Sequence, residues 1–472
     1  MKAVVTSIKT SGFGNRSILY NIIDENGIPH CAESAYKFLP FEIVEAEEAG
    51  SAVEIRDGKS YGTADRKRYS EFVDRAVANI MALGPAQPSA FGKAELRRAV
   101  DSMRDSLAAA ARKFCTALAT GTPVMVRFHG DGDGASGAVA IYRAVEQVAS
   151  SNGMGNAWKS CIFWRINKGI AYTSSDLHSD MLIFDAYDCT EKPLVMIIDF
   201  GTSEESKDAI VSAQGKVDLV WIDHHPIYDG FPADLIGNYV NPWAYGFDSN
   251  TTAGFLACEM AETISGIDAA LLKGASLSSD HSAYADSSKE FVDAGIVIDA
   301  ITLNETHGYE RSNVTPKYID SILNSRQRFE EVLHSASGQL DEAIGIAMKK
   351  LKRYAGTGGL EIFAFNYEHV AKLEFEYLKP GKFGTKLYDR IESEYGHNTL
   401  LALYYRNYII LRVSRLVSKE VGLLKIIGDL RELTDYVIDG GGHNEAASIR
   451  VLQGEARQVL NLLLGSLGYK PG

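Results

Sequence analysis

The segment VMVRFHGDGDGASGAVA places three side chains that can bind a cation directly after an apolar run. His129, Asp131 and Asp133 alternate along the chain, and alternate residues of an extended segment point to the same side. The three side chains can therefore converge on one point. Because neighbouring carboxylates repel each other, this arrangement favours a bound cation. Taken alone, the segment is also compatible with a turn rich in Asp and Gly that binds nothing.

Two further apolar runs, LVMIIDF and VDLVWIDHHP, also end in polar residues. The first ends around Asp199 and the second ends in Asp223, His224 and His225. A buried polar group without a partner lowers the stability of the fold by about 1–3 kcal/mol. These side chains are therefore not expected to belong to the hydrophobic core. Downstream, Asp280 follows a helix-like run. Taken singly, Asp199 and Asp280 are each more typical of a turn or a helix cap.

Together, these carboxylates and imidazoles form a mixed oxygen and nitrogen donor set that suits a pair of Mn²⁺ or Mg²⁺ ions. The chain has five cysteines without a C-x-x-C pair, which excludes a readable zinc ribbon or disulfide framework. Two ions about 3.5–4 Å apart can bridge a phosphate, activate a water and neutralise charge during attack on phosphorus. The residues therefore predict the hydrolysis of a phosphoester.

The elements that must position these residues follow from the pattern of residues 123–300. Short β-type runs alternate there with helical stretches, which predicts the α/β class with a parallel sheet covered by helices. The candidate ligands mostly follow predicted strands. This placement fits binding, because open α/β sheets bind ligands at the carboxyl ends of their strands.

The flanking segments predict further parts around this central domain. We expect a small strand-rich module, a helical segment that docks as a helix pair, the central domain, a helical connector, and a smaller α/β domain. Their expected ranges are 1–75, 76–120, 121–314, 315–357 and 358–472. A cleft between the two α/β domains is the expected substrate site.

Composition and charge narrow the class of protein. The chain has 472 residues, of which 46% are hydrophobic and 23% charged, and this excludes a wholly disordered or fibrous protein. No apolar run reaches membrane-spanning length and no signal-type segment is visible, so we expect a cytoplasmic protein. The net charge of −13 disfavours broad, sequence-independent binding to nucleic acid.

The motifs resemble the DHH phosphoesterase superfamily, and more narrowly its RecJ-like and oligoribonuclease-like branch. They occur in the family's order from about residue 123 onward. A later stretch is similar to the GGGH signature of the DHH-associated C-terminal domain. The matching pieces are HGDGDG (129–134), IIDF around Asp199, IDHHP (222–226), NP…SNTTAG (241–254), SSD at Asp280 and DGGGHNEAAS (439–448).

The resemblance implies a site for two divalent ions, with Mn²⁺ preferred to Mg²⁺. The implied ligands are His129 and Asp131 for one ion, Asp133, His224 and Asp280 for the other, and Asp199 for both. Asp223 is implied to orient the histidines or to assist at the metals. His225 is implied to face the scissile phosphate.

The glycine-rich stretch predicts a phosphate site in the C-terminal domain. Consecutive glycines let backbone N–H groups approach an anion closely. His443 can add a hydrogen bond or a charge, and arginine binds oxyanions as a fork. The alternatives are a flexible turn and a solvated strand residue. The residues concerned are Gly440, Gly441, Gly442, His443, Arg412, Ser414 and Arg415.

The spacing around the two arginines departs from the family's pattern. The family usually places one residue between the serine and the arginine, whereas Ser414 and Arg415 are adjacent. Either Arg412 or Arg415 can therefore be the residue that contacts substrate.

Three functions follow from the resemblance and the charge. The RecJ-type motif favours an exonuclease that removes nucleotides from an end of single-stranded DNA or RNA, compatible with docking to replication or repair proteins. The acidic charge favours a hydrolase of nano-RNA, 3′-phosphoadenosine 5′-phosphate or a cyclic dinucleotide, since a short ligand needs only the metals and one phosphate clamp. The third is a non-catalytic replication or repair scaffold. Competent residues at every expected ligand position favour an enzyme.

Overall fold

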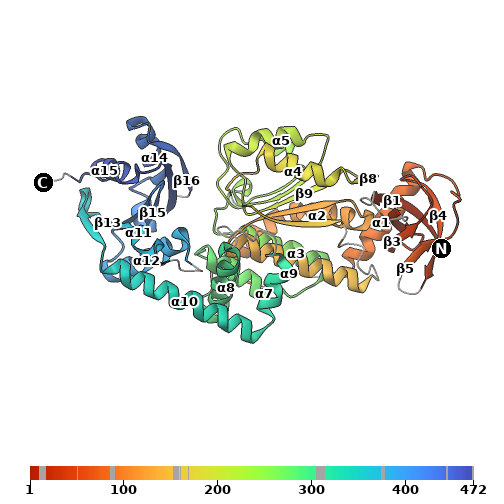
Figure 1. Ribbon diagram of the computed structural model, residues 1–472, viewed down its shortest axis with the longest axis horizontal. Helices are drawn as coiled ribbons and strands as arrows, with labels where there is room; N and C mark the ends of the chain where they lie inside the picture. The colour runs from red at the N-terminus through yellow and green to blue at the C-terminus, as the bar shows by residue number, and fades with distance from the viewer. Residues whose placement is uncertain are drawn as a thin grey trace. The chain divides into compact units, whose positions relative to one another are not determined.

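The computed structural model describes most of the chain as two compact units, residues 1–329 and 330–472 (Figure 1). Among the described residues, no helix combines the length and the hydrophobicity that a membrane span requires. The described residues are 1–9, 18–49, 52–84, 91–152, 159, 161–167, 169–304, 314–373, 378–442 and 445–469.

A five-stranded parallel sheet forms the centre of the first unit, in the order β11-β10-β9-β6-β7. All five residues of β9 are buried, which explains why these strands appear in the sequence as unbroken apolar runs. The predicted α/β class with a parallel sheet is confirmed. The strands are β6 (Val124–His129), β7 (Ile162–Asn167), β9 (Leu194–Ile198), β10 (Asp218–Ile222) and β11 (Asn238–Val240).

Helices cover both faces of this sheet (Figure 1). On one face, Val195 and Ile197 of β9 pack with α4 and α5 around Trp221. On the other face, α3 and α6 contact β6, β9 and β10, and α7, α8 and α9 lie against α3. The helices are α3 (Gly132–Ser151), α4 (Ser174–Phe184), α5 (Lys207–Ala213), α6 (Ala253–Ser265), α7 (Ala270–Ser279), α8 (Lys289–Asn304) and α9 (Pro316–Leu323), with the short turns η2 (Glu204–Ser206), η3 (Ala233–Leu235) and η4 (Pro242–Tyr245).

The N-terminal strands close into a barrel. Strand β1 pairs with both β2 and β4, so the order β1-β2-β3-β5-β4 returns to β1. Strand β8 (Tyr187–Cys189), which precedes β9 in the chain, also pairs with β1. The barrel is therefore joined to the central domain through a shared sheet. The barrel strands are β1 (Lys2–Lys9), β2 (Ile18–Asp24), β3 (Pro29–Ser34), β4 (Ile43–Ala49) and β5 (Ala52–Ile55).

The helices α1 (Arg66–Met81) and α2 (Ala94–Thr120) dock against the outside of β1 and β2. The expected helical range of 76–120 begins too late, because α1 already starts at Arg66. Ile23 is fully buried, and the Thr6 Oγ1 hydroxyl donates to the Thr120 carbonyl at 2.7 Å. A closed five-stranded barrel of this kind is the OB type, whose second and third strands often bind oligonucleotides. Here protein covers the outer side of β2, so that part of the surface is not available to a ligand.

The second unit is built on a six-stranded mixed sheet in the order β12-β13-β14-β15-β17-β16. Helices α10 and α12 pack on one face, and α14 and α15 pack on the other. The elements are α10 (Arg326–Met348), β12 (Lys352–Ala355), η5 (Thr357–Gly359), β13 (Glu361–Asn366), α11 (Glu368–Ala371), α12 (Pro380–Tyr395), β14 (Thr399–Tyr405), β15 (Tyr408–Val413), α13 (Arg415–Ser418), α14 (Leu423–Leu433), β16 (Val437–Gly442), β17 (Ala446–Val451) and α15 (Ala456–Ser466).

The end of the predicted helical connector is wrong in one detail. The apolar spacing extends the helical pattern to Tyr354, but Lys352–Ala355 form strand β12, which pairs antiparallel with β13. Pairing with a strand that is distant from the helix decided the local structure, and the apolar period does not reveal such a partner. Residues 372–373 form a turn after α11, and residues 374–377 lie outside the described residues.

A buried arginine stabilises the sheet below the site. Arg127 on β6 donates from Nε and Nη2 to the two carboxylate oxygens of Asp180 at 2.8 and 2.7 Å, and both side chains are almost fully buried. We expect Arg127→Met to lower the free energy of unfolding by about 3–5 kcal/mol, because it leaves a buried carboxylate without its counterion. Urea denaturation measures this change.

Arg165→Met is the matched control on the neighbouring strand. The Arg165 side chain is 41% exposed and lies 3.9 Å from Asp180, so its loss should cost less than about 1 kcal/mol. Equal losses in the two variants would contradict the assigned role of Arg127.

Candidate metal centre

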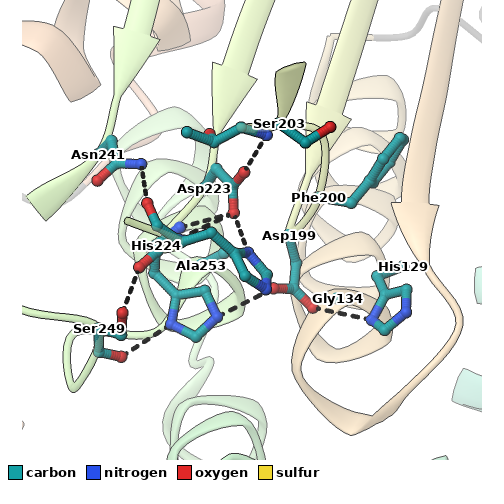
Figure 2. A network of polar contacts seen from close by, with 12 residues as sticks. His129, Gly134, Asp199, Phe200, Ser203, Asp223, His224, Asn241, Ser249 and Ala253 are labelled. Carbon is teal, nitrogen blue, oxygen red and sulfur yellow. Dashed lines mark hydrogen bonds and ion pairs between the residues drawn. The ribbon is translucent and has the colours of Figure 1, made fainter. Parts of the chain in front are cut away.

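The carboxyl ends of β6, β9 and β10 bring His129, Asp199 and His224 together (Figure 2), and Asp280 follows α7. Three sets of donor atoms each lie within 4.8 Å of one another, and together they include every predicted metal ligand. The sets are His129, Asp131 and Asp199; Asp133, His224 and Asp280; and Asp199, His224 and His225.

Asp199 lies between two histidines (Figure 2). Its Oδ2 is 3.5 Å from His129 Nδ1, and its Oδ1 is 3.2 Å from His224 Nε2. The backbone of Asp199 has a φ of 67°, in the left-handed region that non-glycine residues rarely adopt. Such conformations cluster at functional sites, where the surrounding structure maintains them. The two oxygens of this one carboxylate can therefore serve two separate ions.

The first donor set lies at the start of α3. The distance from His129 Nδ1 to Asp131 Oδ2 is 2.9 Å. Asp131 is also the N-cap of α3, because its Oδ1 accepts from the Gly134 N–H at 3.2 Å. The cap and the ligand interpretations of this residue are thus compatible, since each uses a different carboxylate oxygen.

The second donor set centres on His224. Its Nε2 lies 3.2 Å from Asp280 Oδ2 and 3.9 Å from Asp133 Oδ2. Its Nδ1 lies 2.8 Å from the Ser249 carbonyl oxygen (Figure 2). A carbonyl can only accept, so Nδ1 carries a proton and Nε2 is the nitrogen left to bind a metal. This is the tautomer that binds a metal.

Asp133 is fully buried and surrounded by donors. Its oxygens accept from the Ala253 and Gly254 N–H groups at the start of α6, at 3.1 and 3.0 Å, and from the Ser276 hydroxyl. Burial raises its pKa well above the ordinary value, and the charges of Asp199 and Asp280 raise it further. A divalent cation would remove this repulsion, so the donor set fits Mn²⁺ or Mg²⁺.

Asp223 faces the histidine pair instead of the donor sets. Its Oδ1 accepts from His225 Nδ1 at 2.7 Å and from the His224 N–H at 2.8 Å, and its Oδ2 accepts from the Thr202 N–H at 3.0 Å. Burial acts to raise its pKa, but the charge and the hydrogen bond of His225 outweigh burial and lower it. Asp223 therefore stays ionised and fixes the Nδ1 side of the His225 ring.

Comparison with known proteins identifies the family of the central domain and its fold. Residues 123–277 match the model of the DHH family, N-terminal domain. This segment of the chain is a DHH domain. An uncharacterised protein of Methanocaldococcus jannaschii is 25% identical over 446 residues, which are 84% of this chain and 57% of that protein. The chain thus spans little more than half the length of this relative.

A solved structure of a DHH domain shares this fold. The domain comes from a protein described as a member of a family of ribosomal proteins, and it matches with a TM-score of 0.70 and 23% identity, over 86% of this chain and 98% of that one. RecJ from Thermus thermophilus in complex with Mn²⁺ matches with a TM-score of 0.49 and 15% identity, over 83% of this chain and 60% of that one.

The predicted glycine cradle is a strand in the structure, not a turn. Gly440, Gly441 and Gly442 end β16, an edge strand that pairs antiparallel with β17. Gly442 has a φ of 136°, and a Cβ there would lie 2.3 Å from the Ala446 carbonyl oxygen. Glycine is therefore required for this pairing. His443 lies outside the described residues.

The other predicted phosphate-binding residues have local partners. Arg412 on β15 donates from Nε to the Thr385 hydroxyl at 3.1 Å, and burial lowers the pKa of Arg412 to about 10. Ser414 donates to the His397 carbonyl at 2.6 Å and caps α13 by accepting from the Val417 N–H. Arg415 begins α13, and its side chain lies outside the description. Phosphate binding by these residues stays a prediction.

Several supporting residues of the DHH domain escaped sequence reasoning. Asp299 on α8 accepts from the Gly132 N–H at 2.6 Å and so fixes the loop that carries the first ligands. Ser276 donates to Asp133. Ser249 acts through its backbone carbonyl, which every residue type provides. Ser249 lies in the SNTTAG motif, which indicated that this segment belongs to the site but not that the carbonyl of Ser249 takes part. Nothing in the sequence distinguishes Asp299 from other carboxylates in predicted helices.

Proposed function

We propose that this DHH-domain chain is a divalent-metal-dependent phosphodiesterase that hydrolyses single-stranded DNA or RNA from an end. The observation that carries the proposal is the position of Asp199, whose two oxygens face His129 and His224 separately. A carboxylate shared in this way is the arrangement that a two-ion site needs.

The ligand roles follow the donor sets. We propose one ion between His129, Asp131 and Asp199, and a second between Asp133, His224, Asp280 and Asp199. Imidazole in both sets favours Mn²⁺ over Mg²⁺, which prefers oxygen ligands throughout. When bound, the two ions would lower the pKa of a water nucleophile and neutralise charge on the phosphate.

The histidine pair supplies the remaining chemistry. His225 holds its Nδ1 proton against Asp223, which orients its Nε2 toward the site. Burial acts to lower the pKa of His225, but the charge of Asp223 outweighs burial and raises it. His225 can therefore carry a proton at neutral pH, and we propose that it donates a hydrogen bond to the scissile phosphate.

A second candidate substrate is favoured by charge. The net charge of −13 weakens the attraction of a long phosphate backbone, whereas a dinucleotide or 3′-phosphoadenosine 5′-phosphate needs few cations. A non-catalytic scaffold, possible for a chain that docks to replication or repair proteins, is disfavoured because every predicted ligand lies within a compact donor set.

Digestion of end-labelled strands separates these functions. With Mn²⁺ present, we expect DNA or RNA strands graded from dinucleotides to long oligomers to be shortened one nucleotide at a time. Chelation by EDTA should stop the reaction, and added Mn²⁺ should restore it. Cleavage of the shortest substrates alone would support the second candidate. No cleavage of any substrate under these conditions would contradict the proposal of an enzyme.

A further inference from the structure

Two aromatic side chains are exposed beside the metal centre. Trp243 and Tyr245 lie on η4, and 41% and 38% of their surfaces are accessible. Single exposed aromatic residues are common on protein surfaces. This pair differs because hydrogen bonds fix both rings, Trp243 to the backbone of His224 and Tyr245 to Ser106 of α2.

Trp243 is fixed to the backbone of a predicted metal ligand. Its indole N–H donates to the His224 carbonyl at 3.1 Å and lies 3.0 Å from the Ser249 hydroxyl oxygen. The Ser249 hydroxyl donates to the same carbonyl at 2.7 Å (Figure 2). His224 is the residue whose Nε2 faces Asp199 and Asp280. The indole therefore contacts the backbone of the same residue whose side chain contributes Nε2 to the donor set.

The rest of η4 is fixed as well. Asn241 accepts from the Trp243 N–H at 2.9 Å and donates to the His225 carbonyl at 3.0 Å. The Tyr245 hydroxyl is hydrogen-bonded to the Ser106 hydroxyl of α2. The turn that carries the two rings is thus tied to both histidines and to a long helix.

These contacts use the indole N–H and the phenol O–H, and 41% and 38% of the surfaces of Trp243 and Tyr245 are accessible. A rigid aromatic side chain gains contact area with little loss of conformational entropy. Stacking of a base on such a ring contributes about 1–3 kcal/mol and tolerates every base. The net charge of −13 weakens the attraction of this chain to phosphates. Stacking on a base adds affinity that does not depend on this attraction.

We propose that Trp243, with Tyr245 beside it, stacks on a nucleobase of the strand whose phosphate lies at the metal centre. The inference rests on the proposed function, because it assumes a nucleotide substrate. It adds a binding subsite that retains a base next to the scissile phosphate, in addition to the groups that bind the phosphate itself.

Two substitutions separate stacking from a purely positioning role of Trp243. Trp243→Phe keeps an aromatic face and removes the N–H that contacts His224. Trp243→Ala removes both. If the indole serves only to position His224, both variants should weaken Mn²⁺ binding and lower kcat equally. If it stacks on a base, only the alanine variant should lose strand affinity.

Binding is measured with a single-stranded oligonucleotide whose phosphorothioate linkages resist hydrolysis, in the presence of Mn²⁺. We expect Trp243→Ala to raise Kd by about 5- to 150-fold, the equivalent of one stacked base, and Trp243→Phe to raise it by less than about 5-fold. A strand of equal length that lacks its bases should bind the wild-type and both variants alike. Tyr318→Ala, which removes an aromatic ring of similar exposure (40%) on α9, is the matched control and should bind as the wild-type does.

Equal losses for alanine and phenylalanine at position 243, or an equal loss with the abasic strand, would overturn the stacking assignment. The binding assay does not require turnover. If Trp243→Ala alone loses strand affinity but the wild-type protein hydrolyses no substrate, only the proposed function is contradicted. If the wild-type protein is an active enzyme but the two variants bind the strand equally, only this inference is contradicted.

Discussion

Asp199→Asn is expected to lower hydrolysis by on the order of 10³-fold or more while the protein stays folded. The substitution removes the one charge that faces both His129 and His224, so both ions lose a ligand. Asparagine, like aspartate, tolerates the left-handed backbone that this position requires. The loss should therefore come from metal binding, visible as a weaker Mn²⁺ titration at an unchanged unfolding temperature without metal.

The matched control for this experiment is Asp208→Asn. Asp208 lies on α5, is exposed, and makes no ion pair among the contacts that the structure describes. It removes the same charge from the same domain, and we expect activity within about 2-fold of the wild-type, since isolated surface charges contribute little. Wild-type hydrolysis by Asp199→Asn would show that the two-ion assignment is wrong.

Asp223→Asn is expected to reduce kcat by about 10²- to 10⁴-fold, the range that follows when the carboxylate behind a catalytic histidine becomes an amide. Asp223 accepts from His225 Nδ1, from the His224 N–H and from the Thr202 N–H. An amide has only one accepting oxygen, so at least one of these donors must face an NH₂ group. The ring of His225 should then lose its fixed orientation.

The pH dependence of the reaction rate should distinguish Asp223→Asn from the wild-type protein. The charge of Asp223 raises the pKa of His225 against the effect of burial, so neutralising it should lower that pKa. If protonated His225 contacts the phosphate, activity falls as pH rises through its pKa. The alkaline limb of the pH–rate profile should therefore move to lower pH in Asp223→Asn. A profile of unchanged shape and position would exclude His225 as the titrating group.

The gathering of most candidate ligands at one edge of the sheet was predictable from the strand pattern, whereas their individual roles came from the family resemblance and stay predictions. His129 ends β6, Asp131 and Asp133 lie at the start of α3 directly after it, and Asp199 and His224 follow β9 and β10, the neighbouring strands in the sheet. Parallel strands have their carboxyl ends at one edge, so the sheet alone brings these side chains together. The prediction needed no knowledge of side-chain packing, only of strand order.

The remaining features depended on contacts that sequence patterns do not encode. Strand β12 forms because it pairs with β13, although its residues continue a helical period. Closure of the N-terminal barrel depends on β1 pairing with two strands at once. The His224 tautomer depends on a backbone carbonyl of Ser249. In each case the deciding partner is distant in the chain or has no side-chain signature.

The pairing of β8 with β1 limits how this protein can be shortened. Strand β8 belongs to the chain of the central domain, yet its only neighbour in the described sheets is the first strand of the barrel. A recombinant fragment beginning at the central sheet would leave β8 as an unpaired edge strand. Such strands can pair with other chains and cause aggregation. Fragments for crystallisation or for separate assays should therefore retain the first nine residues together with everything that follows them in the first unit.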